Sequence, residues 1–280
     1  MPRTSLKAAL ISTLLIIFAL GVGAAQAAQS VDLIPHRALY KMSLVSASRG
    51  SGIADATGTM LYSFNDGCEA WASETNVNLK LVYAEGGEVE TNWSFASWEA
   101  KDGTAYRFRV RHTRDGNLVE NLKGTVRRAD PAAASEARYS LPKDKLINLP
   151  EGTLFPTRHL LALIAAGQTG RPVFSRTVFD GASMDNPYEI NAIIGRDRMA
   201  TSPAALAAGK LMSAAGLKQH AVRHVRMAFF PRGSMKPEPE FELGVDYRAD
   251  GIARAIRQDF GDFTVDLTPA TIEPLKRPGC

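Results

Sequence analysis

Alternating apolar and polar positions recur along most of the chain. In the run Tyr106–Arg111 the apolar Tyr106, Phe108 and Val110 alternate with arginines, and similar runs cover residues 40–44, 225–229 and 263–267. A period of two places successive side chains on opposite faces of a strand. We therefore expect an antiparallel sheet with one apolar face toward the core and one polar face in water.

Turn signals separate these runs at short intervals. The clearest are Asn65-Asp66-Gly67, Glu85-Gly86-Gly87, Lys101-Asp102-Gly103, Arg114-Asp115-Gly116-Asn117 and Ala249-Asp250-Gly251. Such sequences are typical of hairpin connections, so we expect an all-β fold with roughly a dozen or more strands in one long meander. No linker or short repeat divides the chain, which predicts a single domain over residues 28–280.

One helix interrupts the strand pattern. Pro156 suits a first helical turn, Leu160, Leu161 and Ile164 share one face, and Gly167 is a plausible C-terminal cap, so the pattern predicts a helix over residues 156–167. The alanine-rich segment Thr201–Gly216 fits either a short helix or a mobile loop, and its composition does not decide between them.

Residues 1–27 resemble an export signal. Arg3 and Lys7 precede an apolar run over residues 8–23, and Ala25-Gln26-Ala27 offers a small-x-small cleavage sequence. The apolar run is shorter than the ~20 residues that span a bilayer. We expect cleavage after Ala27, which makes the mature protein soluble, periplasmic and not membrane-spanning, and we expect a monomer.

Charge argues against nucleic acid as a partner. Removal of Arg3 and Lys7 leaves 31 basic and 29 acidic residues, a formal charge of +2. A nucleic-acid-binding protein needs a concentrated basic face, and an exported protein rarely meets nucleic acid.

Two cysteines, Cys68 and the final residue Cys280, fall in this exported chain. Periplasmic thiols are oxidised, which favours a disulfide between them, with free thiols or intermolecular pairing as the alternatives. Their wide separation does not fit a CxxC redox pair or a zinc knuckle.

The mature sequence contains no HExxH, GxSxG or Walker loop. His220 and His224 are four residues apart, but their segment alternates like a strand, so we interpret both as exposed strand residues. His159 is expected to pack or cap within the helix. The pattern indicates a protein without metal, cofactor or catalytic residues, and a hydrolase of envelope polymer is the least favoured alternative.

Two groups of residues are candidates for binding. Trp71, Trp93 and Trp98 lie on neighbouring expected strands, where aromatic side chains fill a core or line a ligand pocket. Trp93 and Trp98 have opposite parity, so one is exposed or a bulge intervenes. Arg107, Arg109 and Arg111 share one side of a strand, as a solvated face or a surface for anionic lipid or an acidic partner.

Several stretches together resemble the EipB family of cell-envelope integrity proteins. They are Ile34-Pro35-His36-Arg37-Ala38-Leu39-Tyr40, Ser51-Gly52-Ile53, Thr57-Gly58-Thr59-Met60-Leu61-Tyr62-Ser63-Phe64 before Cys68, Leu154-Phe155-Pro156-Thr157-Arg158-His159-Leu160, Val178-Phe179-Asp180-Gly181-Ala182-Ser183 and Ala192-Ile193-Ile194-Gly195. The resemblance implies a periplasmic open β-spiral, or half-barrel, with a helix and with a disulfide between Cys68 and Cys280. It supplies no catalytic residues.

These observations favour a non-enzymatic protein that maintains envelope integrity under stress. We expect it to bind a lipid, lipopeptide or protein partner in the concave face of its sheet. The alternative is a protein-interaction module or envelope-stress sensor that uses an exposed strand edge or the segment Thr201–Gly216.

Overall fold

The computed structural model describes residues 31–198 and 202–280; the expected export signal over residues 1–27 and Thr201 lie outside the described residues. Fourteen strands form one open sheet in which every neighbouring pair is antiparallel, in the order β8-β7-β6-β5-β4-β3-β2-β1-β14-β13-β12-β11-β10-β9. The expectation of an all-β meander forming an open sheet is confirmed.

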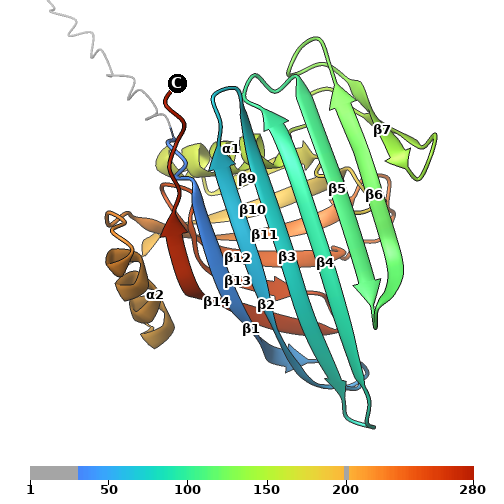
Figure 1. Cartoon of the computed structure of the whole chain (residues 1–280), viewed down its shortest axis with the longest axis vertical. Coiled ribbons are helices and arrows are strands. Elements are labelled where there is room, and N and C mark those ends of the chain that lie inside the picture. The colour runs from blue at the N-terminus through green and yellow to red at the C-terminus, as the bar shows by residue number, and fades with distance from the viewer. Residues whose placement is uncertain (1–30, 199–201) are drawn as a thin grey trace, which may run out of the picture.

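The strands follow the alternating runs of the sequence. Their bounds are β1 His36–Ala47, β2 Ile53–Asp66, β3 Ala70–Tyr83, β4 Glu88–Ala100, β5 Ala105–Arg114, β6 Asn117–Arg127, β7 Ser135–Leu141, β8 Leu146–Leu149, β9 Val173–Val178, β10 Tyr188–Arg198, β11 Val222–Pro231, β12 Phe241–Arg248, β13 Ala253–Asp259 and β14 Phe263–Pro274. The sheet coils: β1 to β6 form a broad front layer, and β9 to β13 cross behind it (Figure 1).

Helix α1, Pro156–Gln168, confirms the expected helix, but the predicted role of Gly167 is wrong. Gly167 is a buried residue inside the helix, where a Cβ would lie 2.8 Å from the Arg223 guanidinium. The left-handed conformation that ends many helices belongs instead to Gly170, with a φ of +73°.

Helix α2, Pro203–Ala214, settles the alternative left open for the alanine-rich segment. Ser202 caps it, because its Oγ accepts a hydrogen bond of 3.2 Å from the Ala205 N–H. Figure 1 shows α2 beside β14, and Met212 packs into a core cluster with residues of β1 and β14. Among the described residues, no helix is both long and apolar enough to cross a membrane.

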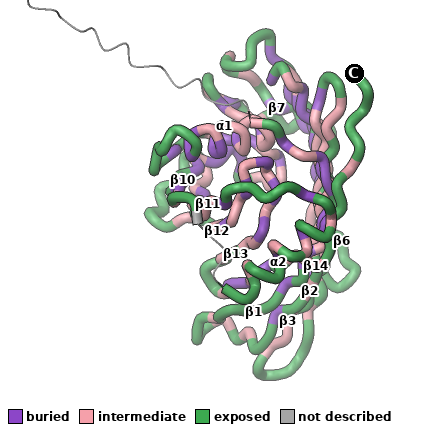
Figure 2. The backbone as a smooth tube through the Cα atoms, turned by 90° about the vertical axis from the view of Figure 1, so that its left-hand side faces the viewer, coloured by how far each residue is buried: buried purple, intermediate pink, exposed green. Residues whose placement is uncertain are grey.

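The core lies between the two layers and is built from the apolar faces of the strands. Tyr106, Phe108 and Val110 are 0%, 3% and 0% exposed, whereas the arginines between them are exposed. Buried segments line the space between the layers (Figure 2). Below, the inner face is the one that carries these buried side chains, and the outer face is the opposite one.

Helix α1 plugs one end of this space and is held there by a carboxylate from β4. Its own N-cap residue, Phe155, makes no side-chain cap. Glu99, which is 1% exposed, accepts hydrogen bonds from the Thr157 N–H at 2.7 Å and the Arg158 N–H at 2.9 Å. A carboxylate suits the partial positive charge of a helix N-terminus, so β4 fixes the position of α1.

Candidate functional site

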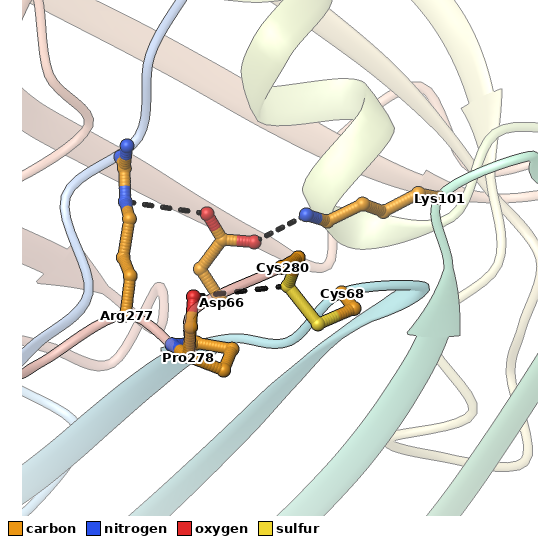
Figure 3. The surroundings of a disulfide bond; sticks show 6 residues. All are labelled: Asp66, Cys68, Lys101, Arg277, Pro278 and Cys280. Atoms are coloured by element: carbon orange, nitrogen blue, oxygen red, sulfur yellow. Dashed lines mark hydrogen bonds and ion pairs between the residues drawn. A yellow bond between two sulfur atoms is a disulfide. The ribbon is translucent and has the colours of Figure 1, made fainter.

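The turn between β2 and β3 and the C-terminal segment meet at one rim of the sheet. Cys68 lies in that turn, and a disulfide joins it to Cys280 across a Cα–Cα distance of 5.8 Å and a sequence separation of 212 residues (Figure 3). The disulfide therefore links an early hairpin to the end of the chain, as the family resemblance implies.

Charged side chains surround this disulfide (Figure 3). Asp66 lies between two cations: the Lys101 Nζ is 2.6 Å from one of its carboxylate oxygens, and the Arg277 Nε is 3.4 Å from the other. Arg277 also donates to the Asp32 carboxylate at 2.5 Å and to the Leu33 carbonyl at 2.6 Å. These contacts join both ends of the described chain to two hairpin turns.

The three tryptophans do not form one site. The β3–β4 pairing has no register shift, so Trp93 and Trp98 lie on opposite faces of β4 without a bulge. Trp98 is on the outer face, with the Arg107 guanidinium 4.6 Å from its ring centroid. Trp71 lies near the disulfide rim, where the Lys101 Nζ is 5.8 Å from its ring centroid. Only Trp93 lies in the middle of the inner face.

Trp93 belongs to a continuous row of inner side chains. The strand registers place Tyr40 opposite Met60, Met60 opposite Val77, Val77 opposite Trp93, and Trp93 opposite His112. In the adjacent row, Tyr62 and Phe95 both lie opposite Thr75, and the Phe95 ring stacks on Trp93 with centroids 5.7 Å apart. We call Met60, Tyr62, Val77, Trp93 and Phe95 the inner strip.

The inner strip is only partly buried, although fully buried side chains such as Tyr40, Leu79 and Val110 lie on either side of it. All five side chains pack against the core as half-buried residues, between one cluster that contains Tyr40 and Leu79 and another that contains Val110 and Leu122. Half-buried apolar side chains on a concave surface are typical of sites for apolar ligands. The sequence identified Trp93 but not Met60, Tyr62 or Val77 as its neighbours, because their adjacency depends on the registers of two hairpins, β2–β3 and β3–β4.

A titratable pair ends the row. His112 lies opposite Glu120 on β6. Burial lowers the pKa of His112, with a further contribution from Arg114, and burial raises the pKa of Glu120, with a further contribution from Asp185. Both shifts favour the neutral side chains, so this end of the row is less polar than its residue types indicate.

The three predicted arginines lie together on the outer face. Arg107, Arg109 and Arg111 are exposed on β5, and Lys123 of β6 lies opposite Arg109. None of the four forms a salt bridge with another described residue. The structure thus places the arginine row and the inner strip on opposite faces of the sheet.

The sequence missed a polar cavity on the outer face of β11 to β14. His224, expected to be an exposed strand residue, lines this cavity and contacts the Asp246 carboxylate through its Nδ1 at 2.9 Å. Gly244, in the middle of β12, lies at its floor. A glycine inside a strand pattern is a signal of close approach to the backbone and would have identified the place. The described residues contain no cluster of histidine, cysteine and acidic side chains suited to a metal ion.

Comparisons with known proteins agree with this architecture. A family model described as EipB-like matches residues 27–276. The cell envelope integrity protein EipB of Brucella abortus (strain 2308) is 28% identical over 246 residues, which cover 87% of this chain and 85% of that protein. The crystal structure of a beta-barrel-like protein of domain of unknown function DUF1849 from Brucella abortus matches with a TM-score of 0.78 and 27% identity, over 88% of this chain and 100% of that chain. The coiled sheet and the match over nearly the whole chain together confirm the resemblance, and the chain belongs to the EipB-like family.

Proposed function

We propose that the protein is an exported, periplasmic envelope-integrity protein that works by binding and not by catalysis. Its ligand is the apolar part of a lipid or lipopeptide, which lies along the inner strip. The carrying observation is that Met60, Tyr62, Val77, Trp93 and Phe95 remain half-buried between two clusters of fully buried side chains. The envelope-integrity description of the Brucella relative supports the cellular role.

The inner strip suits an acyl chain for a simple reason. It crosses three strands and consists of apolar and aromatic side chains, and such surfaces favour apolar partners by ~25 cal/mol per Å² removed from water. Burial shifts the pKa values of the nearby His112 and Glu120 toward their neutral forms, as expected beside an apolar surface.

Single-tryptophan proteins test this proposal. The double variant Trp71→Phe/Trp98→Phe keeps only Trp93, on the inner strip, and the matched variant Trp71→Phe/Trp93→Phe keeps only Trp98, on the outer face. Titration with a doxyl-labelled lysophospholipid below its micelle concentration is expected to quench Trp93 saturably and to leave Trp98 nearly unchanged. Equal quenching of the two proteins, or none in either, would contradict a lipid site on the inner strip.

A second candidate function is protein interaction through the edge strand β9. The Leu154 N–H donates to the Thr177 carbonyl, and the Phe179 N–H donates to the Leu154 carbonyl, each at 2.9 Å, so these groups of Thr177 and Phe179 point away from β10. Because backbone groups alternate in direction along a strand, the N–H and C=O groups of Val173 and Ser175 point the same way. Val173 and its cross-strand neighbour Ile193 are 57% and 63% exposed. An extended segment of a partner protein fits such an edge. Replacing Ile193 by Lys is expected to abolish crosslinking of this protein to a periplasmic partner protein. Retention of the crosslink would exclude the β9 edge as the docking site.

A further inference from the structure

A cavity of about 620 Å³ lies on the outer face of β11 to β14, next to the start of α2. Its lining comes from five elements of the sheet and from Ser202, Ala204 and Ala205 at the helix N-terminus. The inner strip lies on the inner face of β2 to β4, so this cavity is separate from the proposed lipid site. It does not depend on the proposed function.

Gly244 leaves room for the His224 ring in the lining of the cavity. The registers place Arg226 opposite it on β11 and Arg257 opposite it on β13, so two long cationic side chains flank a position without a side chain. A Cβ at Gly244 would lie 3.2 Å from the His224 Cε1. Any larger residue would therefore fill the space between the arginines and press on the histidine ring.

Cationic and anionic side chains both line the cavity, and some of them pair with one another. Arg226 donates to Glu242 at 2.5 Å, and Arg257 makes two hydrogen bonds with Asp266 at 2.7 and 2.8 Å. Asp259, which also lines the cavity, forms no salt bridge with the described residues. Its Oδ1 accepts a hydrogen bond from the Gly261 N–H at 2.8 Å, which leaves its Oδ2 for a cation.

His224 is oriented within this set. Its Nδ1 is bonded to Asp246, whose other carboxylate oxygen accepts from the Arg254 guanidinium at 3.2 Å. Among the described residues, none makes a hydrogen bond with the His224 Nε2. Because Asp246 holds the His224 ring through its Nδ1, the Nε2 of His224 is available for a polar contact in the cavity.

The lining excludes several kinds of ligand. No aromatic side chain of Trp, Tyr or Phe contributes to it, so sugar rings and nucleobases find no stacking surface. The apolar contributions are limited to Val45, Ile256, Leu267 and three alanines, which is too little for an acyl chain. The lining carries two arginines and four carboxylates, so an anion would meet more like charge than opposite charge, whereas a ligand with both signs can match both kinds of group.

We propose that this cavity binds a small zwitterionic ligand of the peptide class, with a free amine and a free carboxylate. The ligand carboxylate would be placed near Arg226, Arg257 and the Ala204 N–H at the start of α2, because the next N–H, that of Ala205, is already bonded to the Ser202 Oγ. The amine would be placed near Asp259.

The test uses tri-alanine as the probe and the isotope-labelled mature protein. Amide resonances of Ala204, Ala205, His224 and Gly244 are expected to shift saturably with tri-alanine, and not with N-acetyl-tri-alanine amide, whose ends carry no charge. Gly244→Val is expected to weaken binding by at least ~10-fold, which corresponds to ~1.4 kcal/mol. The matched control is Gly50→Val, at an exposed turn where a Cβ meets no atom within 4 Å.

A second variant protects the test against a folding defect. Asp259→Asn keeps the shape of the side chain and removes its charge, and it is expected to weaken tri-alanine binding while the melting temperature stays unchanged. Quenching of Trp93 by the doxyl lipid should persist in both cavity variants. The proposal is overturned if the charged and capped peptides shift the same resonances equally, if neither shifts them, or if both variants bind like the wild type.

Discussion

His159 shows how one side chain of α1 couples stability to pH. It is 6% exposed, its ring lies 5.9 Å from the Phe174 ring between centroids, and its Nε2 has no hydrogen-bond partner among the described residues. Burial, with a smaller contribution from the charge of Arg176, lowers the pKa of His159 from 6.5 to about 4. A neutral histidine is therefore part of the folded structure, as the sequence suggested when it placed His159 in the helix as a packing residue.

The first prediction concerns acid stability. Below pH 6.5 the unfolded chain binds a proton at His159 that the folded chain does not bind until pH approaches 4, so folding loses free energy as pH falls through this window. The wild type is expected to lose about 2 to 3 kcal/mol more than His159→Leu between pH 7 and pH 4.5. Urea unfolding at both pH values measures this. Parallel losses in the two proteins would show that His159 is not the responsible group.

At the scale of elements, hairpin registers explain both what the sequence predicted and what it did not. Alternation alone assigned Tyr106 to the core and Arg107 to the surface, because a strand has only two faces. Alternation could not predict that His224 lies opposite Asp246 or that Val77 lies opposite Trp93, because these neighbours depend on how two strands are aligned. Gly167 was assigned to a helix end for a similar reason: the contact of α1 with Arg223 cannot be read from the helix sequence.

The second prediction tests how β4 positions α1. Replacing Glu99 by Gln keeps the size of the side chain, but one of its two oxygens becomes an amide that cannot accept from the Thr157 or Arg158 N–H. The expected loss is about 1 to 3 kcal/mol of unfolding free energy, measured by denaturant titration. Glu74→Gln, an exposed change on β3, is the matched control and should cost almost nothing. Equal stability of the two variants would mean that the Glu99 charge does not hold α1.

The third prediction concerns the arginine row of β5, which we propose contacts anionic envelope lipid. Arg109→Glu/Arg111→Glu is expected to reduce binding to phosphatidylglycerol vesicles at low salt, and added salt should reduce wild-type binding because exposed charges are screened. Lys143→Glu/Lys145→Glu changes the net charge equally at exposed positions between β7 and β8. Sedimentation with the vesicles measures the bound fraction of each double variant. A similar reduction in both variants would indicate an effect of net charge and exclude a specific surface.

At the scale of the whole molecule, the coiled sheet brings the ends of the described chain together. β14 pairs with β1, and the disulfide, Asp66 and Arg277 then fasten the last residues to the β2–β3 turn. The sequence predicted this closure only through the family resemblance and the count of two cysteines. The coiling of β9 to β13 behind the front layer has no local signal, because it results from the twist accumulated over many strands.

The fourth prediction concerns the disulfide. Cys68→Ser or Cys280→Ser is expected to lower the melting temperature and to raise protease sensitivity, while the protein still folds, because β14 remains paired with β1. In the chain-entropy model, removing this disulfide lowers the free energy of unfolding by at most roughly 5 kcal/mol. The double serine variant should match either single variant. Identical melting temperatures for oxidised and reduced wild type would remove any stabilising role.

The central claim is that the inner strip holds a lipid or lipopeptide in the cell. The most direct measurement is gentle native mass spectrometry of the protein purified from its own periplasm, followed by organic extraction and lipid analysis. The account predicts a stoichiometric adduct that is lost on extraction and identified there as an acylated molecule. Bare protein alone, with no acylated molecule in the extract, would contradict it and would leave the β9 edge as the better-supported site.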